Sequence, residues 1–160
     1  MKTNIKKILI ALDYDPTAQK VAEEGYSLAK SMEAEVVLLH VIADPSYYYP
    51  REPITIMGFA GYTETDPLKL DRTKGLKMES QQFLNKSKEH LGNEAISTLV
   101  KEGDFAETII KTAKELKIDI IVLGTHSRKW LEEIVMGSVT KKVLQLTSIP
   151  IFIIPTKKGK

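Results

Sequence analysis

The feature that most constrains the fold is the alternation of short apolar runs with segments of helical periodicity. Five apolar runs stand out, at Ile5 to Leu12, Glu35 to Ile42, Ala95 to Lys101, Ile118 to Leu123 and Ile151 to Ile154. Runs of this kind are typical of strands covered on both faces, as in a parallel sheet. Five strands are therefore predicted.

Helical patterns lie between these runs. Asp15 and Pro16 suit the N-cap and first position of the first helix. Asp104 suits the cap of a later one, and Gly92 suits the end of a weaker helical pattern from Pro67 to Leu91. Because strand and helix alternate, the crossovers should be right-handed and the sheet mostly parallel. The prediction is a Rossmann-like α/β fold, an open sheet with helices on both faces.

Composition limits the setting of such a fold. The chain has 160 residues, the size of one domain, and no cysteine for a disulfide or a thiolate metal site. Its 23 Lys and Arg against 21 Asp and Glu do not favour a nucleic acid as partner. No apolar run approaches the ~20 residues of a membrane span, so we expect no membrane association and a cytoplasmic location.

Residues 1–160 are thus read as a single domain with two irregular parts. Prolines and glycines interrupt any regular structure between residues 43 and 66, which we expect to be an irregular insertion. The last residues, 156–160, are expected to form a frayed tail.

Ligands of open α/β sheets bind beyond the carboxyl ends of strands. Asp13 follows the first run and offers a charged acceptor for a sugar hydroxyl or a ring amine. Backbone groups near Val41 can reach the edge of a flat ring. Gly124 lacks a side chain where a ligand would approach closely. Gly137, Ser138 and Val139 then present free amides at a helix start, which favours an anion. Ordinary helix capping explains a Gly-Ser pair equally well.

The spacing of Gly124, Ser127 and Gly137-Ser138, within this order of elements, resembles the universal stress protein family. That family carries a loop of the form G-x2-G-x9-G-[ST] after its fourth strand. The opening ILIALD, the run VVLLHVI and the ending SIPIFIIP are also similar to the family, so the resemblance covers nearly the whole chain.

The resemblance implies a five-stranded parallel sheet of the adenine nucleotide alpha-hydrolase-like type. It also implies a homodimer built through the last strand, Ile151, Phe152, Ile153 and Ile154, and ATP binding in one branch of the family. In that branch Asp13 would hold the ribose or adenine, and the backbone at Val41 would read adenine. The triphosphate would be surrounded by Gly124, Ser127, Gly137, Ser138 and Val139.

Some residues depart from the family pattern. Ser127 replaces the second glycine of the loop, Trp130 stands where glycine is frequent, and Tyr14-Asp15 replaces a frequent Gly-Ser pair. The segment LDYDPT from Leu12 to Thr17 lacks the SGGxDS of the related ATP-using transferases, so that class is less favoured.

The remaining alternatives concern the mode of action. No carboxylate in the loop is placed to catalyse efficient hydrolysis, so we expect a nucleotide-responsive binder with slow ATP turnover at most, and no catalytic residues. The rival hypothesis is a nucleotide-free dimeric scaffold acting through protein partners that the sequence does not identify. The histidine spacing predicts no protein-held metal site, although Mg²⁺ or Mn²⁺ can accompany the phosphates.

Overall fold

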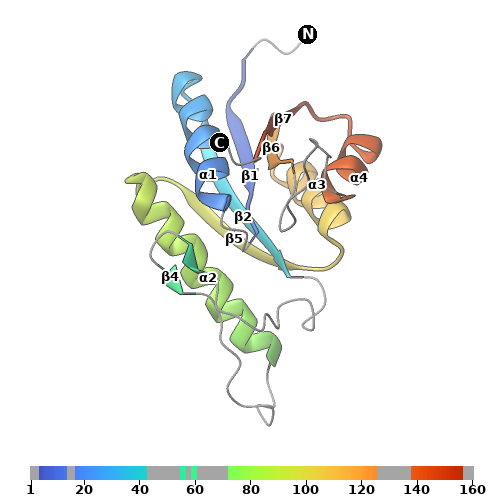
Figure 1. Ribbon diagram of the computed structural model, residues 1–160. Helices are drawn as coiled ribbons and strands as arrows, with labels where there is room; N and C mark the ends of the chain where they lie inside the picture. Colours follow the sequence, from blue (N-terminus) through green and yellow to red (C-terminus); the bar gives the residue numbers. More distant parts are fainter. Residues whose placement is uncertain are drawn as a thin grey trace.

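The computed structural model describes residues 4–13, 17–42, 55–56, 59–60, 72–125 and 138–156. Along the chain, the elements are β1 (Lys7–Ala11), α1 (Ala18–Ser31), β2 (Glu35–Ile42), β3 (Thr55–Ile56), β4 (Phe59–Ala60), α2 (Arg72–Leu91), β5 (Ser97–Glu102), α3 (Phe105–Glu115), β6 (Ile120–Gly124), α4 (Ser138–Leu146) and β7 (Ile151–Ile154). Five strands form one sheet in the order β5-β2-β1-β6-β7, and all neighbouring pairs are parallel (Figure 1). The predicted α/β fold is confirmed.

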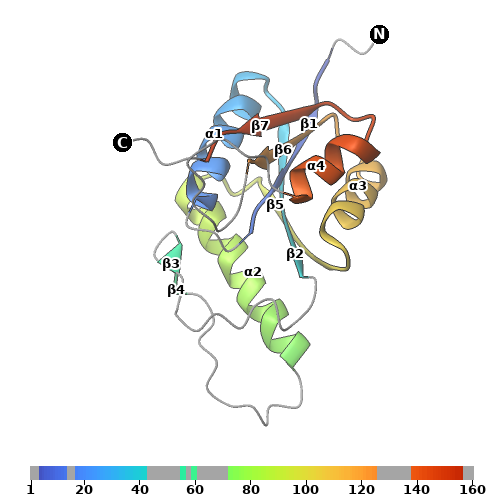
Figure 2. The same cartoon turned by 45° about the vertical axis from the view of Figure 1, so that its right-hand side comes forward.

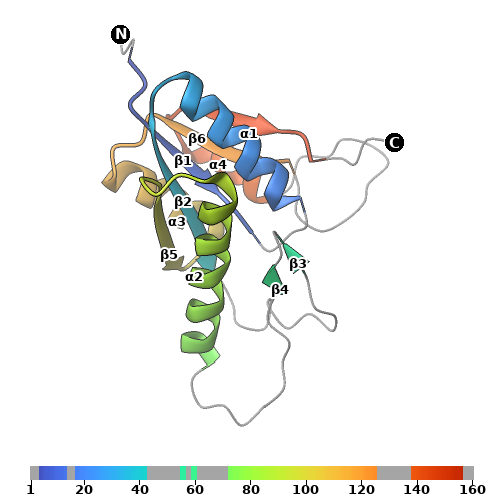
Figure 3. The ribbon, with the colours of Figure 1, turned by 90° about the vertical axis from the view of Figure 1, so that its left-hand side faces the viewer.

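The sheet is the middle of three layers. Helices α1 and α2 cover one face, and α3 and α4 cover the other (Figures 2 and 3). Successive residues of a strand point to opposite faces. In β1, Ile8 and Ile10 therefore join the core beneath α1 and α2, whereas Leu9 joins the core beneath α3 and α4. Burial on both sides is why the strands read as continuous apolar runs.

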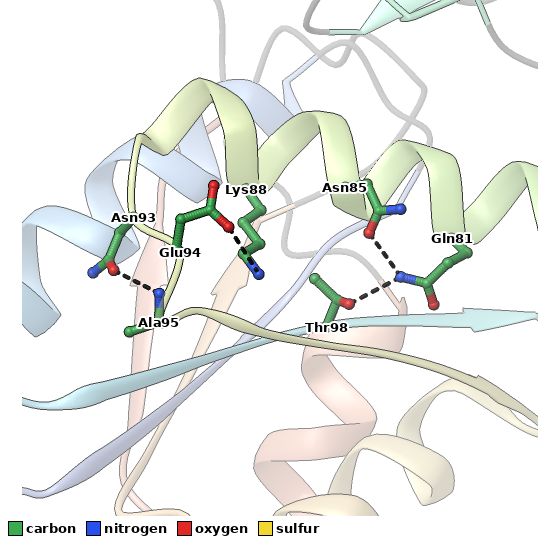
Figure 4. Close-up of polar contacts among 7 residues, drawn as sticks. All are labelled: Gln81, Asn85, Lys88, Asn93, Glu94, Ala95 and Thr98. Atoms are coloured by element: carbon green, nitrogen blue, oxygen red, sulfur yellow. Dashed lines mark hydrogen bonds and ion pairs between the residues drawn. The ribbon is translucent and has the colours of Figure 1, made fainter.

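Helix α2 is held against the edge strand β5 by polar contacts as well as by its apolar face. The Gln81 side-chain amide donates to Thr98 Oγ1 and to Asn85 Oδ1, each at 2.9 Å (Figure 4). Gly92 ends the helix with a φ of +71°, and its amide donates to the Lys88 carbonyl at 3.0 Å. This confirms the predicted C-cap, because glycine adopts the left-handed conformation without steric cost.

The first helix begins later than predicted. Helix α1 starts at Ala18, and its N-cap is Thr17, whose side chain makes no capping hydrogen bond. The predicted cap Asp15 and first-turn Pro16 lie outside the described residues. Aspartate and threonine are both accepted at an N-cap, and a local pattern locates helix ends only to within one or two residues.

The second predicted cap is confirmed, and it also connects two helices. Asp104 Oδ2 accepts from the Glu107 amide at 3.0 Å, which begins α3, and from Lys142 Nζ of α4 at 3.1 Å. These two contacts hold the pKa of Asp104 below its ordinary value, because both favour the ionised carboxylate. The pair thus positions α4 beside α3 on the same face of the sheet.

The structure describes some residues of the two parts that the sequence predicts to be irregular, 43–66 and 156–160. Within 43–66, the described residues form a short antiparallel pair in which Ile56 lies opposite Phe59. At the other end, Thr156 is buried and hydrogen-bonded, so ordered structure extends into the expected tail. Residues 157–160 lie outside the described part. No helix within that part is long and apolar enough to cross a membrane.

Candidate functional site

The strand order reverses between β1 and β6. From β1 the chain proceeds outward through β2 to β5, whereas β6 lies on the other side of β1 and leads to β7. Ile10 of β1 is paired with Val122 of β6, and three residues farther along each segment the chain reaches Asp13 and Thr125. In open α/β sheets this reversal leaves a crevice at the carboxyl ends of the strands. The structure therefore brings the predicted Asp13 and Gly124 to the same point of the sheet.

The backbone that leads into Asp13 is anchored by the neighbouring strand β2. The Leu12 amide donates to the Leu39 carbonyl at 2.8 Å, and the Leu12 carbonyl accepts from His40 Nδ1 at 2.8 Å. Since a carbonyl only accepts, the neutral His40 ring carries its proton on Nδ1. The Asp13 side chain that follows is half-buried. The residue before Asp13 is thus held in a defined position by β2.

His40 is a structural histidine. Its side chain is fully buried in β2 and meets the ring of Phe83 of α2 edge-on, with 5.8 Å between ring centroids. Burial lowers the pKa of His40 to about 4, and the hydrogen bond to Leu12 opposes this only in part. At neutral pH the ring is therefore uncharged and serves to connect β1, β2 and α2.

The end of β6 is connected to the first turn of α4. Thr140 Oγ1 donates to the Gly124 carbonyl at 2.9 Å, and Thr140 is buried. Val139, one of the predicted site residues, lies beside it and is half-buried. The start of α4 carries no acidic side chain in its first turn, so its own residues leave the positive end of the helix dipole uncompensated. Gly124 and Val139 are thus brought together.

Val41 occupies the end of β2, but its side chain is in the core. Only 4% of it is exposed, and it packs with the residues beneath α3 and α4. The next residue, Ile42, accepts at its carbonyl from the Gly103 amide at 3.0 Å. Any contact of Val41 with a ligand would therefore be made by its backbone, as the sequence-based prediction has it.

The structure describes no side chain for three of the predicted site residues, Ser127, Gly137 and Ser138. Ser127 and Gly137 lie outside the described residues, as does Trp130. Ser138 is placed as the first residue of α4, and nothing is described of its side chain. Their roles stay predictions.

Sequence reasoning missed a set of buried threonines around Gly124. Thr125, Thr140 and Thr156 are each at most 5% exposed, and all hydrogen-bond with one another or with Gly124. For Thr125 and Thr156 the sequence signal is a hydroxyl residue at the end of an apolar run, directly after β6 for Thr125 and after Pro155, the residue that follows β7, for Thr156. Across the described ranges, no group of three or more His, Asp or Glu side chains is arranged to hold a metal ion.

Comparison with known proteins agrees with this architecture. The model of the universal stress protein family matches residues 4–155. Universal stress protein MJ0577 of Methanocaldococcus jannaschii is 30% identical over 99% of this chain and 100% of its own length. Universal stress protein YxiE of Bacillus subtilis is 29% identical over 92% of this chain and 97% of its own.

Solved structures show the same fold. A structure of MJ0577 superposes with a TM-score of 0.71 at 24% identity, covering 97% of this chain and 99% of the other. A universal stress protein solved in complex with cAMP superposes with a TM-score of 0.63 at 13% identity, covering 97% of this chain and all of the other.

Proposed function

The chain belongs to the universal stress protein family, and from that premise we propose that it is a nucleotide-responsive regulatory protein that binds ATP and acts as a homodimer. The observation that carries this proposal is the meeting of Asp13 and Gly124 at the reversal of strand order, with the first turn of α4 bonded to Gly124 through Thr140. Asp13, an acceptor for the nucleoside, and the positive end of α4, suited to phosphate, then lie at the same end of the sheet, beyond the carboxyl ends of the strands.

Each residue has a role in this proposal. Asp13 holds the ribose or adenine, and the backbone of Val41 reads the adenine edge. The triphosphate lies among Gly124, Ser127, Gly137, Ser138 and Val139. The absence of acidic residues from the first turn of α4 suits this arrangement, because no carboxylate there would repel phosphate. Mg²⁺ or Mn²⁺ would be held mainly by the phosphates and water.

A calorimetric titration with ATP, ADP, AMP and cAMP tests the proposal. ATP should bind most tightly, because the terminal phosphates add contacts with backbone amides and the helix end. The cAMP arm is included because a structurally similar family member was solved with that ligand. If none of the four nucleotides binds, ATP recognition is refuted and the nucleotide-free scaffold takes its place. Tighter binding of cAMP than of ATP would refute the triphosphate assignment.

Replacing Ser127 by glycine should strengthen ATP binding. If this loop position needs a left-handed backbone, serine costs about 1–2 kcal/mol more than glycine, and that difference corresponds to roughly a tenfold change in affinity. The dissociation constants of wild type and Ser127→Gly are compared in the same titration. An unchanged or weaker affinity in the variant would contradict this loop geometry.

The homodimer is proposed to form through β7. This strand lies at an edge of the sheet, where its described pairing is with β6 alone, and Phe152 is 40% exposed. Leu144 and Leu146 of the preceding helix α4 are also exposed. An open apolar edge strand invites pairing with a second strand, here that of another copy.

Phe152→Glu should convert the dimer to a monomer, because it places a charge in the contact that β7 would bury. Light scattering at micromolar concentration gives the mass. The matched control is Met78→Glu, since Met78 is 57% exposed on α2, away from β7. A wild-type monomer, or an unchanged dimer in Phe152→Glu, would argue against this interface.

A further inference from the structure

The space in front of the Gly124 α-carbon is filled by the protein itself. A Cβ atom built on Gly124 would lie 2.9 Å from Cγ2 of Val21 in α1 and 2.9 Å from Cγ2 of Thr156. Both distances are well below the ~3.5–4.0 Å of an ordinary carbon contact. Gly124 is not among the glycines with a positive φ, so the backbone conformation does not demand glycine here. Glycine is needed here because α1 and the segment after β7 pack closely against position 124.

The same segment is hydrogen-bonded to the residue that follows Gly124. The Thr156 amide donates to Thr125 Oγ1 at 3.0 Å, and the two threonine hydroxyls are 3.1 Å apart. The Thr125 amide in turn donates to the Ile154 carbonyl at 3.1 Å. Thr125 and Thr156 are 5% and 3% exposed, so water competes little for these bonds.

We propose that Thr156 is a positioning residue for residues 126–137, the segment that holds Ser127 and Gly137 of the proposed triphosphate site. It packs against Gly124 and bonds to Thr125, and so fixes the point at which the chain leaves β6 for residues 126–137. This inference rests on the proposed ATP function and adds to it a residue outside the family's glycine loop. It also assigns the glycine at position 124 to contacts with Val21 and Thr156.

Two substitutions separate the two contacts of Thr156. Thr156→Val removes the hydroxyl and keeps the branched shape, and it should weaken ATP binding about tenfold through the misplaced loop. Thr156→Ser keeps the hydroxyl and removes Cγ2, and it should stay within about threefold of wild type. Equal affinity in wild type and Thr156→Val would overturn the inference.

Ser87→Ala is the control for a merely structural loss. Ser87 is fully buried in α2, and its hydroxyl donates to the Phe83 carbonyl at 2.9 Å. Its removal should lower the melting temperature about as much as Thr156→Val, since each variant loses a buried hydroxyl hydrogen bond. Only Thr156→Val should lower affinity. A parallel loss of affinity in Ser87→Ala would show that the effect is general destabilisation.

The role of Gly124 is tested by suppression. Gly124→Ala should lower both affinity and melting temperature. Adding Val21→Ala and Thr156→Ser removes both methyl groups that the new Cβ would meet, and should restore most of each loss. If the ligand itself requires the glycine, the triple variant will bind as weakly as Gly124→Ala, and this assignment fails.

A ligand-free measurement distinguishes this inference from the proposed function. Trp130 is the single tryptophan of the chain and lies within residues 126–137, so its quenching by acrylamide reports on the loop alone. Without nucleotide, Thr156→Val should quench more readily than wild type, Thr156→Ser and Ser87→Ala. If wild type binds no nucleotide but this difference appears, the proposed function fails and the positioning of the loop stands. Equal quenching in all four proteins refutes the positioning role.

Discussion

Acidification to pH 4 is expected to remove about 3 kcal/mol from the free energy of unfolding through His40 alone. The pKa of this buried ring is lowered to about 4 in the folded protein, against 6.5 when the ring is exposed. Between these values the unfolded chain binds the proton more readily than the folded one. The contribution of His40 is therefore fully present above pH 6.5 and is lost as the pH falls toward 4. The added proton must go to Nε2, because Nδ1 already donates to the Leu12 carbonyl.

Urea unfolding at pH 7.5 and pH 4 measures the effect, with His40→Asn as the control. Asparagine can place its side-chain NH₂ near the position of Nδ1, and it does not titrate. The variant will be less stable at both pH values because it is smaller. Its loss of stability between the two pH values should nevertheless be about 3 kcal/mol less than that of wild type. The same pH dependence in both proteins would contradict this account of His40.

Phe83→Ala is expected to lower the free energy of unfolding by about 3–5 kcal/mol. Phe83 has no exposed surface, and among the residues that the structure describes it is the largest fully buried side chain. It anchors α2 to the sheet and meets His40 edge-on. Its removal leaves a cavity beneath α2 that surrounding side chains can fill only in part.

Met78→Ala on the same helix is the control for Phe83→Ala. Met78 is 57% exposed, so its truncation should change stability by less than about 0.5 kcal/mol. Both variants are compared with wild type by urea unfolding at pH 7.5. A loss below about 1 kcal/mol in Phe83→Ala would mean that α2 does not depend on this contact.

The central strands could be predicted from local pattern because burial on both faces leaves little choice of residue. Central strand β2 has the predicted bounds, Glu35–Ile42. Edge strand β7 also has its predicted bounds, Ile151–Ile154, because all four of its residues are apolar. Strand β5 was predicted at Ala95 to Lys101 and is found at Ser97–Glu102, and at the sheet edge its central residues are only half-buried. An edge strand can carry polar side chains, as β5 does with Ser97, Thr98 and Lys101, and its bounds are then less distinct in the sequence.

The position of Asp13 and Gly124 in the sheet was predictable from the sequence, whereas the side-chain contacts around Gly124 were not. Asp13 and Gly124 stood out because each ends an apolar run, and the structure brings them together. The threonines escaped notice because their partners are 31 residues apart for Thr125 and Thr156, and 16 for Thr140 and Gly124. A local sequence pattern does not predict hydrogen bonds between residues so far apart along the chain.

What the sequence determined by itself is the alternation of strand and helix, because periodicity and burial act on neighbouring residues. The tertiary structure alone decided the strand order, and with it the reversal of that order between β1 and β6. The reason that glycine suits position 124 is also seen only in the tertiary structure. Val21, Gly124 and Thr156 are distant along the chain, and only the packing of α1 and the C-terminal segment against β6 brings their atoms to one place.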